Sequence, residues 1–354
     1  MEMEWGHREP RRADILLPEL VKGATAVERR SLNRRARAGD VIALARNVYL
    51  PACTWNELGV TDRGLVRRAA AAAATRTGVL VGRSAALAHG FPVRDIDPSP
   101  VEIGHPRDRR TRMEGQAVHR WLRWPEADIE EIGGIRVTAA GPTVVDVALR
   151  HGFEDGLMVA DAALAMGHPR SELAAAAMSL RSPGAAAEVV AHADGESGSP
   201  GESAARAQLI RAGILGAVPQ VNVFTSGKVH LGRVDLLLPR ELVVVEFHGS
   251  GKFDGVYGDG GARFSREWWR ERRLVAAGLG TVHVGWQDVE AGRVPDMVRA
   301  AIRERAALLA VGRGFDGYFL PASQRWPDGF MTWTKAQQLE ERRREIEAFE
   351  HERD

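Results

Sequence analysis

The feature that most constrains this chain is a break in composition at residues 193–203. The segment ADGESGSPGES is rich in Gly, Ser and acidic residues, and it separates a long Ala-rich helical stretch from a region with strand-like apolar runs. The chain has 354 residues, which is enough for about two or three domains. We therefore predict a domain boundary near residue 196.

Composition limits the class of protein. The chain is 44% hydrophobic and 27% charged, as is typical of soluble globular proteins. No apolar run approaches the roughly 18 residues that cross a bilayer, and the start, MEMEWGHREPRRAD, lacks an apolar signal-peptide core. The single cysteine, Cys53, leaves no intrachain disulfide and no Cys-based zinc framework. We expect a cytoplasmic protein with no membrane partner.

The segment ERRSLNRRARAGDVIALARNVYLP, residues 28–51, predicts a helix followed by a hairpin. The basic helix ends at Gly39, and the two strands are expected at Val41–Ala45 and Asn47–Leu50. Between residues 22 and 46, seven basic residues stand against two acidic ones. Such an excess of positive charge suits contact with nucleic-acid phosphates, and its alternative interpretation is a solvated Arg-rich helix.

Spacing suggests which arginines of this helix would contact DNA. Arg30, Arg34 and Arg37 recur every three to four residues and therefore share one face, while Leu32 faces the core. The hairpin that follows has the position of a wing, and this favours DNA or RNA binding over plain solvation.

The second half of the chain predicts an αβββαβ order of elements. The expected elements are a helix at 202–212, strands at 218–225, 229–238 and 242–247, a helix at 263–277 and a strand at 281–286. Residues 61–169 before it predict a separate α+β unit, and residues 170–200 a helical linker.

Two carboxylates interrupt the apolar strands of this second half. Asp235 begins one apolar run and Glu246 ends the next, although a buried carboxylate is costly unless a cation or hydrogen-bond donors compensate for it. In a hairpin centred on Arg240 and Glu241 the two side chains lie directly opposite, with Cβ atoms about 5 Å apart. That separation allows both to bind one Mg²⁺ or Mn²⁺ ion. The alternative is that Asp235 and Glu246 are solvated strand ends, with Asp235 paired to Arg233 or Arg211.

Three further residues near this hairpin are candidates for the chemistry. His248 shares the face of Glu246 and could act as a general acid or base. Lys252 could stabilise charge that develops on a phosphate. Glu202 is either a third carboxylate near the metal or a favourable charge at a helix N-terminus.

These motifs resemble a known nuclease group. The segments ESAARAQLIRAG, GRVDLLLP, VVVEFHG with a following lysine, and FSREWWRERRLVAAGLGTVHVGWQDV are similar to the PD-(D/E)xK nuclease superfamily, in particular to very-short-patch-repair (Vsr)-like domains. The resemblance implies Mg²⁺-dependent hydrolysis of phosphodiester bonds, with Asp235 and Glu246 as metal ligands. His248 stands where the motif has its lysine, and Lys252 is the expected substitute.

The first half resembles a different family. RSLNRRARAGDVIALARNVYLP, RSAALAHGF and PTVVDVALRHGFEDGLMVADAAL are similar to the AbiEi-type antitoxin and transcriptional-regulator family. The resemblance implies a winged helix that contacts DNA through Arg34, Arg35 and Arg37, whereas the spacing argument selects Arg30, Arg34 and Arg37.

Together these patterns predict a multidomain protein of the α/β and α+β classes, with a restriction-endonuclease-like core. The expected domains are a winged helix at 1–60, an AbiEi-like α+β domain at 61–169, a helical linker at 170–200, a PD-(D/E)xK nuclease-like domain at 201–300 and a helical extension at 301–354. One predicted function is a DNA-binding, Mg²⁺-dependent endodeoxyribonuclease in phage defence or DNA processing. The other is an AbiEi-like antitoxin or repressor whose nuclease-fold domain is inactive and whose partner is a cognate toxin or a second copy of the chain.

Overall fold

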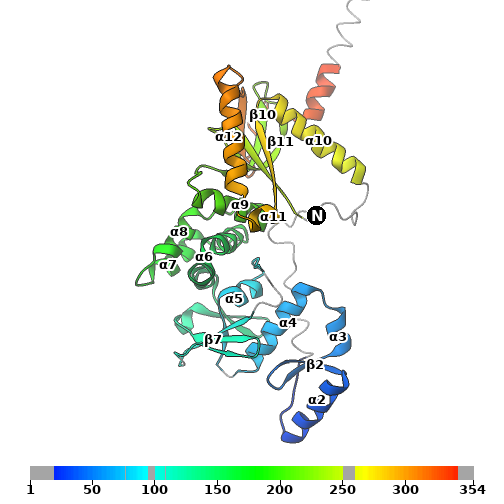
Figure 1. Ribbon diagram of the computed structural model, residues 1–354, viewed down its shortest axis with the longest axis vertical. Coiled ribbons are helices and arrows are strands. Elements are labelled where there is room, and N and C mark those ends of the chain that lie inside the picture. Colours follow the sequence, from blue (N-terminus) through cyan, green and yellow to red (C-terminus); the bar gives the residue numbers. More distant parts are fainter. Residues whose placement is uncertain (1–19, 76, 95–99, 108, 250–259, 342–354) are drawn as a thin grey trace, which may run out of the picture. The chain divides into compact units, whose positions relative to one another are not determined.

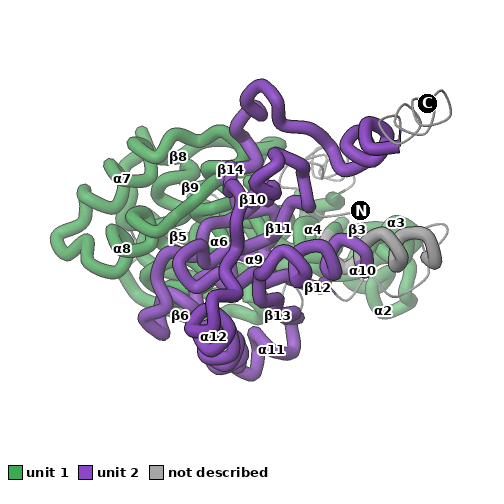
Figure 2. Tube along the Cα trace, turned by 90° about the horizontal axis from the view of Figure 1, so that it is seen from above, with its two compact units in different colours: residues 1, 3–195 green, residues 2, 196–354 purple. Residues whose placement is uncertain are grey.

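The computed structural model describes residues 20–75, 77–94, 100–107, 109–249 and 260–341. The chain divides into two units between Gly195 and Glu196 (Figure 2). Both units combine helices with β-sheets, so the protein is a mixed α/β chain with more than one core. No helix in the described ranges is long and apolar enough to cross a membrane.

The first unit begins with a small antiparallel sheet and the helices beside it. Its elements are β1 (Val21–Lys22), α2 (Ala26–Ala38), β2 (Val41–Ala45), β3 (Val48–Pro51), α3 (Ala52–Glu57) and α4 (Val60–Ala73). The strands lie in the order β1-β3-β2. The predicted basic helix and both strands of the predicted hairpin are therefore present.

Local sequence explains where α2 starts and stops. Thr25 and Glu28 form a reciprocal capping box at its N-terminus, which satisfies backbone N–H groups of the first turn. Gly39 ends the helix with a φ of 86°, a left-handed conformation that glycine adopts readily. Leu32 is buried and packs with Tyr49 of β3, which leaves the arginines of α2 exposed.

The rest of the first unit is a six-stranded mixed sheet with helices. Its strands are β4 (Val79–Leu80), β5 (Val101–His105), β6 (Arg112–Glu114), β7 (Ala117–Trp121), β8 (Ile129–Ile132) and β9 (Ile135–Thr138), in the spatial order β6-β7-β5-β4-β9-β8. Its helices are α5 (Gly82–Ala88), α6 (Ala140–Ala165), α7 (Arg170–Met178) and α8 (Gly184–His192), and the 3-10 turn η2 (Glu126–Asp128) precedes β8. Leu80, Ile103 and Val137 from neighbouring strands form the core beneath α4 and α5.

Residues 170–200, expected as a helical linker, are packed more tightly than a linker would be. Helices α7 and α8 both contact α6. Leu173 of α7 and Val189 of α8 are fully buried. A Cβ atom at Gly156 of α6 would lie 3.0 Å from a methyl group of Val189, so this glycine permits the close approach of α6 and α8. Burial of these apolar side chains makes both helices part of the first unit.

The second unit follows the predicted order of elements. It contains α9 (Pro200–Arg211), β10 (Val218–Thr225), β11 (His230–Leu238), β12 (Val243–His248), α10 (Gly260–Ala276), β13 (Gly280–Gly285), α11 (Trp286–Glu290), α12 (Val294–Ala310) and β14 (Gly317–Pro321). The spatial order of the strands is β13-β12-β11-β10-β14, with β12 and β13 parallel and the other pairs antiparallel. Helices α10 and α12 lie on opposite sides of these strands (Figure 1).

Helices on both faces account for the apolar runs in the central strands. Helix α10 contacts β11 and β13, whereas α9 and α12 both contact β12. The run Val243–Val245 is therefore buried on both faces, as is typical of covered strands. Gly201 of α9 lies against the ring of Phe247, where a Cβ atom would come within 2.1 Å of a ring carbon. This contact fixes the start of α9 beside the end of β12.

The C-terminal region departs from the expected helical extension. Helix α12 and a helix from residue 333 are present, but Gly317–Pro321 forms β14, which pairs with β10. Phe319 packs against the core of the sheet. The added strand covers the edge of β10, whose backbone groups would otherwise lack strand partners.

Candidate active site

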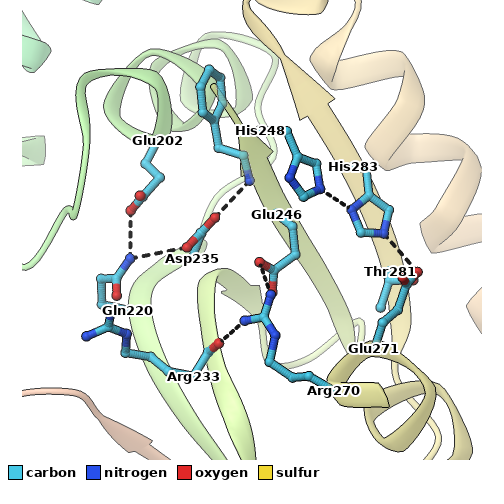
Figure 3. A network of polar contacts seen from close by, with 11 residues as sticks. Glu202, Gln220, Arg233, Asp235, Glu246, His248, Arg270, Glu271, Thr281 and His283 are labelled. Atoms are coloured by element: carbon cyan, nitrogen blue, oxygen red, sulfur yellow. Dashed lines mark hydrogen bonds and ion pairs between the residues drawn. The ribbon is translucent and has the colours of Figure 1, made fainter. Parts of the chain in front are cut away.

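The predicted hairpin register is present in the second unit. Leu236 pairs with Val245 and Leu238 with Val243, which is the register of a hairpin centred on Arg240 and Glu241. Continued by one residue, this register places Asp235 opposite Glu246. The backbone N–H of Phe247 donates a 2.8 Å hydrogen bond to Oδ2 of Asp235, so this carboxylate lies at the end of β12 (Figure 3).

Glu202 lies close to Asp235 at the start of α9. Its Oε2 accepts hydrogen bonds of 2.9 Å from the backbone N–H of Gly198 and from Nε2 of Gln220. The same Gln220 nitrogen lies 3.4 Å from Oδ1 of Asp235 and thus bridges the two carboxylates (Figure 3). The sequence left two interpretations of Glu202 open, a charge at a helix N-terminus and a carboxylate near the other candidates. Glu202 lies in the first turn of α9 and also close to Asp235.

Burial and the neighbouring charge perturb Glu202. Its residue surface is 5% exposed. Desolvation, followed by the negative charge of Asp235, raises the pKa of the Glu202 carboxyl to about 7. Hydrogen bonds from Gln220 and Gly198 act in the opposite direction and are weaker. A cation between these carboxylates would reduce the repulsion that raises this pKa.

Glu246 is held by a cation from α10. Its side chain is 5% exposed, and its Oε2 accepts a 2.9 Å hydrogen bond from Nη2 of Arg270. Arg270 also donates through Nη1 to the backbone carbonyl of Arg233 on β11. The guanidinium compensates for the charge of a carboxylate that burial alone would disfavour.

His248 belongs to a series of hydrogen-bonded side chains on β12, β13 and α10. Its Nε2 lies 2.6 Å from Nδ1 of His283, and Nε2 of His283 lies 2.8 Å from Oε1 of Glu271 (Figure 3). The hydrogen bond from His283 lowers the pKa of Glu271, which favours the ionised carboxylate. When Nε2–H of His283 donates to Glu271, the acceptor of the His283 ring is Nδ1, which faces Nε2 of His248.

The residues of this site fit a hard divalent cation only in part. Asp235 and Glu246 supply carboxylate oxygens, which Mg²⁺ prefers together with retained waters. Within the described ranges, no three His, Cys, Asp or Glu side chains converge into a ready metal cluster. Glu202 is instead linked to Asp235 through Gln220. Lys252 lies outside the described residues.

A cavity opens next to Asp235. Its volume is about 440 Å³, and it lies between β11, α10 and the segment that begins the last helix. The lining residues are His230, Leu231, Gly232, Arg233, Asp235, Arg270, Arg273, Thr332, Trp333 and Thr334. Three arginines against one carboxylate make this surface suited to an anion.

The predicted DNA-binding arginines belong to the first unit. Arg30, Arg34, Arg35 and Arg37 are all exposed on α2. Spacing selected Arg30, Arg34 and Arg37, and the resemblance implied Arg34, Arg35 and Arg37. All four residues are exposed, so both sets stay predictions.

Sequence reasoning missed Gln220, Arg270 and the pair His283 and Glu271. Gln220 carried a signal in the sequence, because it is a polar residue in a run of strand residues. Arg270 is one of several arginines in α10, and nothing in the local sequence distinguishes it.

Comparison with known proteins gives no family for this chain. No family model, curated protein or solved structure matches it.

Proposed function

We propose that this protein is a DNA-binding, Mg²⁺-dependent endonuclease. The observation that supports the proposal is the hairpin register, which continued by one residue sets Asp235 opposite Glu246 at the ends of two buried strands, with Glu202 close to Asp235. Carboxylates in that arrangement are costly without a cation, and the order of elements around them is αβββαβ. The class proposed for the second unit is the PD-(D/E)xK nuclease-like fold.

The proposed chemistry assigns a role to each group. Mg²⁺ bound by Asp235 and Glu246 would lower the pKa of a bound water and neutralise charge on the phosphate. With Nδ1 of His283 as the acceptor, Nε2–H of His248 donates the hydrogen bond between the two rings, and Nδ1 of His248 would be the general base. His283 and Glu271 hold the ring in this tautomer, and Arg270 places positive charge beside Glu246.

The first unit is the proposed DNA-binding module. Helix α2 with the hairpin β2–β3 has the element order of a winged helix, and its exposed arginines suit backbone phosphates. The contacts proposed are Arg30, Arg34, Arg35 and Arg37. We place the protein in the cytoplasm, in phage defence or DNA processing.

A second function is an AbiEi-like antitoxin or repressor with an inactive nuclease-fold domain. The ion pair between Arg270 and Glu246 favours it, because a guanidinium already compensates for this carboxylate. His248 in place of the motif lysine favours it as well. A cognate toxin or a second copy of the chain would then be the partner.

Metal binding separates the two functions. Isothermal titration of the full chain with Mn²⁺ is expected to give binding that Asp235→Ala abolishes. Binding that persists in this variant, or no binding by the wild type, would favour the repressor.

A further inference from the structure

The cavity beside Asp235 is lined by more cationic than anionic side chains. Arg233, Arg270 and Arg273 line it together with the single carboxylate of Asp235. Arg270 forms an ion pair with Glu246. Arg273 is held in a different way.

Arg273 is placed by an aromatic ring and not by an acid. Its guanidinium lies 4.9 Å from the ring centroid of Trp333. In the part of the chain that the structure describes, no carboxylate forms an ion pair with it, and its Nε is buried without a hydrogen-bond acceptor. A half-buried guanidinium with these surroundings retains donors for an anionic ligand.

Burial and the neighbouring positive charges shift the pKa values of two residues that line the cavity. Burial, followed by the charge of Arg270, lowers the pKa of Arg273. Burial, followed by the charge of Arg273, lowers the pKa of His230 on the same wall. An anion in the cavity would remove the electrostatic part of both effects.

The residues on either side of Trp333 add neutral donors. Thr332 and Thr334 flank Trp333 at the start of the last helix, where Oγ1 of Thr332 accepts a 3.2 Å hydrogen bond from the backbone N–H of Lys335. Planar guanidinium groups and hydroxyls are the usual partners of phosphate oxygens. Asp235 lines the same cavity.

We propose that this cavity binds a backbone phosphate of the DNA strand next to the cleavage point, with Arg273 as its main contact. The inference rests on the proposed function for its ligand, a nucleic-acid strand, but it does not require that the strand be cut. Arg273 and Trp333 thereby become binding residues that hold the substrate beside the carboxylates. Because Trp333 lies at the start of the last helix, that helix becomes part of the proposed site.

The test measures binding without catalysis. Fluorescence anisotropy of a labelled eight-nucleotide single strand is recorded with the full chain in EDTA, over a range of salt concentrations. Arg273→Gln is expected to weaken binding about tenfold and to reduce the salt slope by about 0.7, the value for one phosphate contact to a single strand. Arg273→Lys keeps the charge and is expected to recover part of the affinity.

A neighbouring arginine supplies the matched control. Arg272 is exposed and lies 4.6 Å from the ring centroid of Trp268, and it does not line the cavity. Arg272→Gln is expected to change affinity by less than about twofold. Equal losses in both variants, no loss in Arg273→Gln, or no binding by the wild type would each overturn the inference. Thermal unfolding of each variant shows that a loss of binding is not a loss of fold.

Competition identifies the source of the phosphate. Inorganic phosphate and a nucleoside monophosphate are expected to displace the oligonucleotide only at concentrations at least about a hundredfold above its own. Displacement by either at equal concentration would mean that the cavity takes free phosphate compounds, which contradicts the inference. If binding follows the predicted pattern but the protein cuts no DNA, the inference stands and the endonuclease proposal fails.

Discussion

Arg270 on α10 donates from Nη2 to Oε2 of Glu246 on β12, at 2.9 Å. The pair joins a helix to the strand that carries the second candidate metal ligand. Because Glu246 is nearly fully buried, this guanidinium stabilises its charge. A divalent cation bound by Glu246, as proposed, would therefore compensate for the same carboxylate as Arg270.

This relationship predicts how Arg270→Gln changes stability. Without metal, the variant removes a cation from beside a buried carboxylate and is expected to lose about 2–3 kcal/mol of unfolding free energy. Mg²⁺ is expected to restore more stability to the variant than to the wild type. Urea unfolding with EDTA or with Mg²⁺ measures both. An equal response to Mg²⁺ in the two proteins would argue against metal binding at Glu246.

Glu202 predicts a dependence of stability on pH. Its pKa is about 7 in the folded chain against an ordinary value of 4.5, so the folded state binds more protons between these two values. Stability from this group is therefore complete below pH 4.5 and is lost as pH rises towards 7. Glu202→Gln removes the loss and is expected to gain about 1–3 kcal/mol relative to the wild type at pH 8.

Urea unfolding of both proteins at pH 5 and pH 8 checks this prediction. The relevant quantity is the difference between the variant and the wild type, because other titrating groups are common to both. A difference that does not change with pH would contradict the raised pKa of Glu202.

The close approach of α9 to β12 predicts the effect of a single methyl group. Gly201→Ala places a Cβ atom against the ring of Phe247 and is expected to destabilise the protein by about 1–3 kcal/mol. Gly184→Ala is the matched control, because nothing lies within 4 Å of its added Cβ atom at the start of α8. That variant is expected to be neutral or slightly more stable. Thermal unfolding of the two variants measures the contrast, and equal effects would refute the packing described for α9.

The arginines of α2 predict a salt-dependent effect on DNA binding. Arg34→Gln with Arg37→Gln is expected to lower affinity for duplex DNA at all sequences and to reduce the salt slope by about 2, or 0.9 for each phosphate contact. Arg303→Gln with Arg313→Gln removes the same charge from exposed positions of the second unit. Electrophoretic mobility shifts across a salt series compare the two. A larger effect of the control pair would move the DNA-binding surface away from α2.

Much of the fold follows from local sequence. The apolar runs around Asp235 and Glu246 and the short turn between them determine the hairpin register, and the structure has that register. The end of α2 at Gly39 was predictable in the same way, since glycine takes the left-handed conformation that ends a helix. Both features depend on residues that are near each other in the chain.

The partners of the site were not predictable in this way. Glu246 and His283 are neighbours in the parallel register of β12 and β13. No tight turn joins these two strands, so the local sequence does not determine that register. Helix α10 contains several arginines, and the way it packs on the sheet determines that Arg270 is the one that reaches Glu246. The short apolar segment at Gly317–Pro321 became a strand because β10 offered an open edge. These relationships arise from tertiary packing, which local patterns do not contain.

The central claim is that Asp235 and Glu246 support metal-dependent hydrolysis of DNA. The most direct test incubates plasmid, short duplex and single-stranded DNA with the wild type, Asp235→Ala and Glu246→Ala, at low salt with Mg²⁺ or Mn²⁺. The account predicts cleavage by the wild type alone, and none after chelation of the metal. Cleavage that survives in both variants, or DNA bound by all three proteins and cut by none, would contradict it.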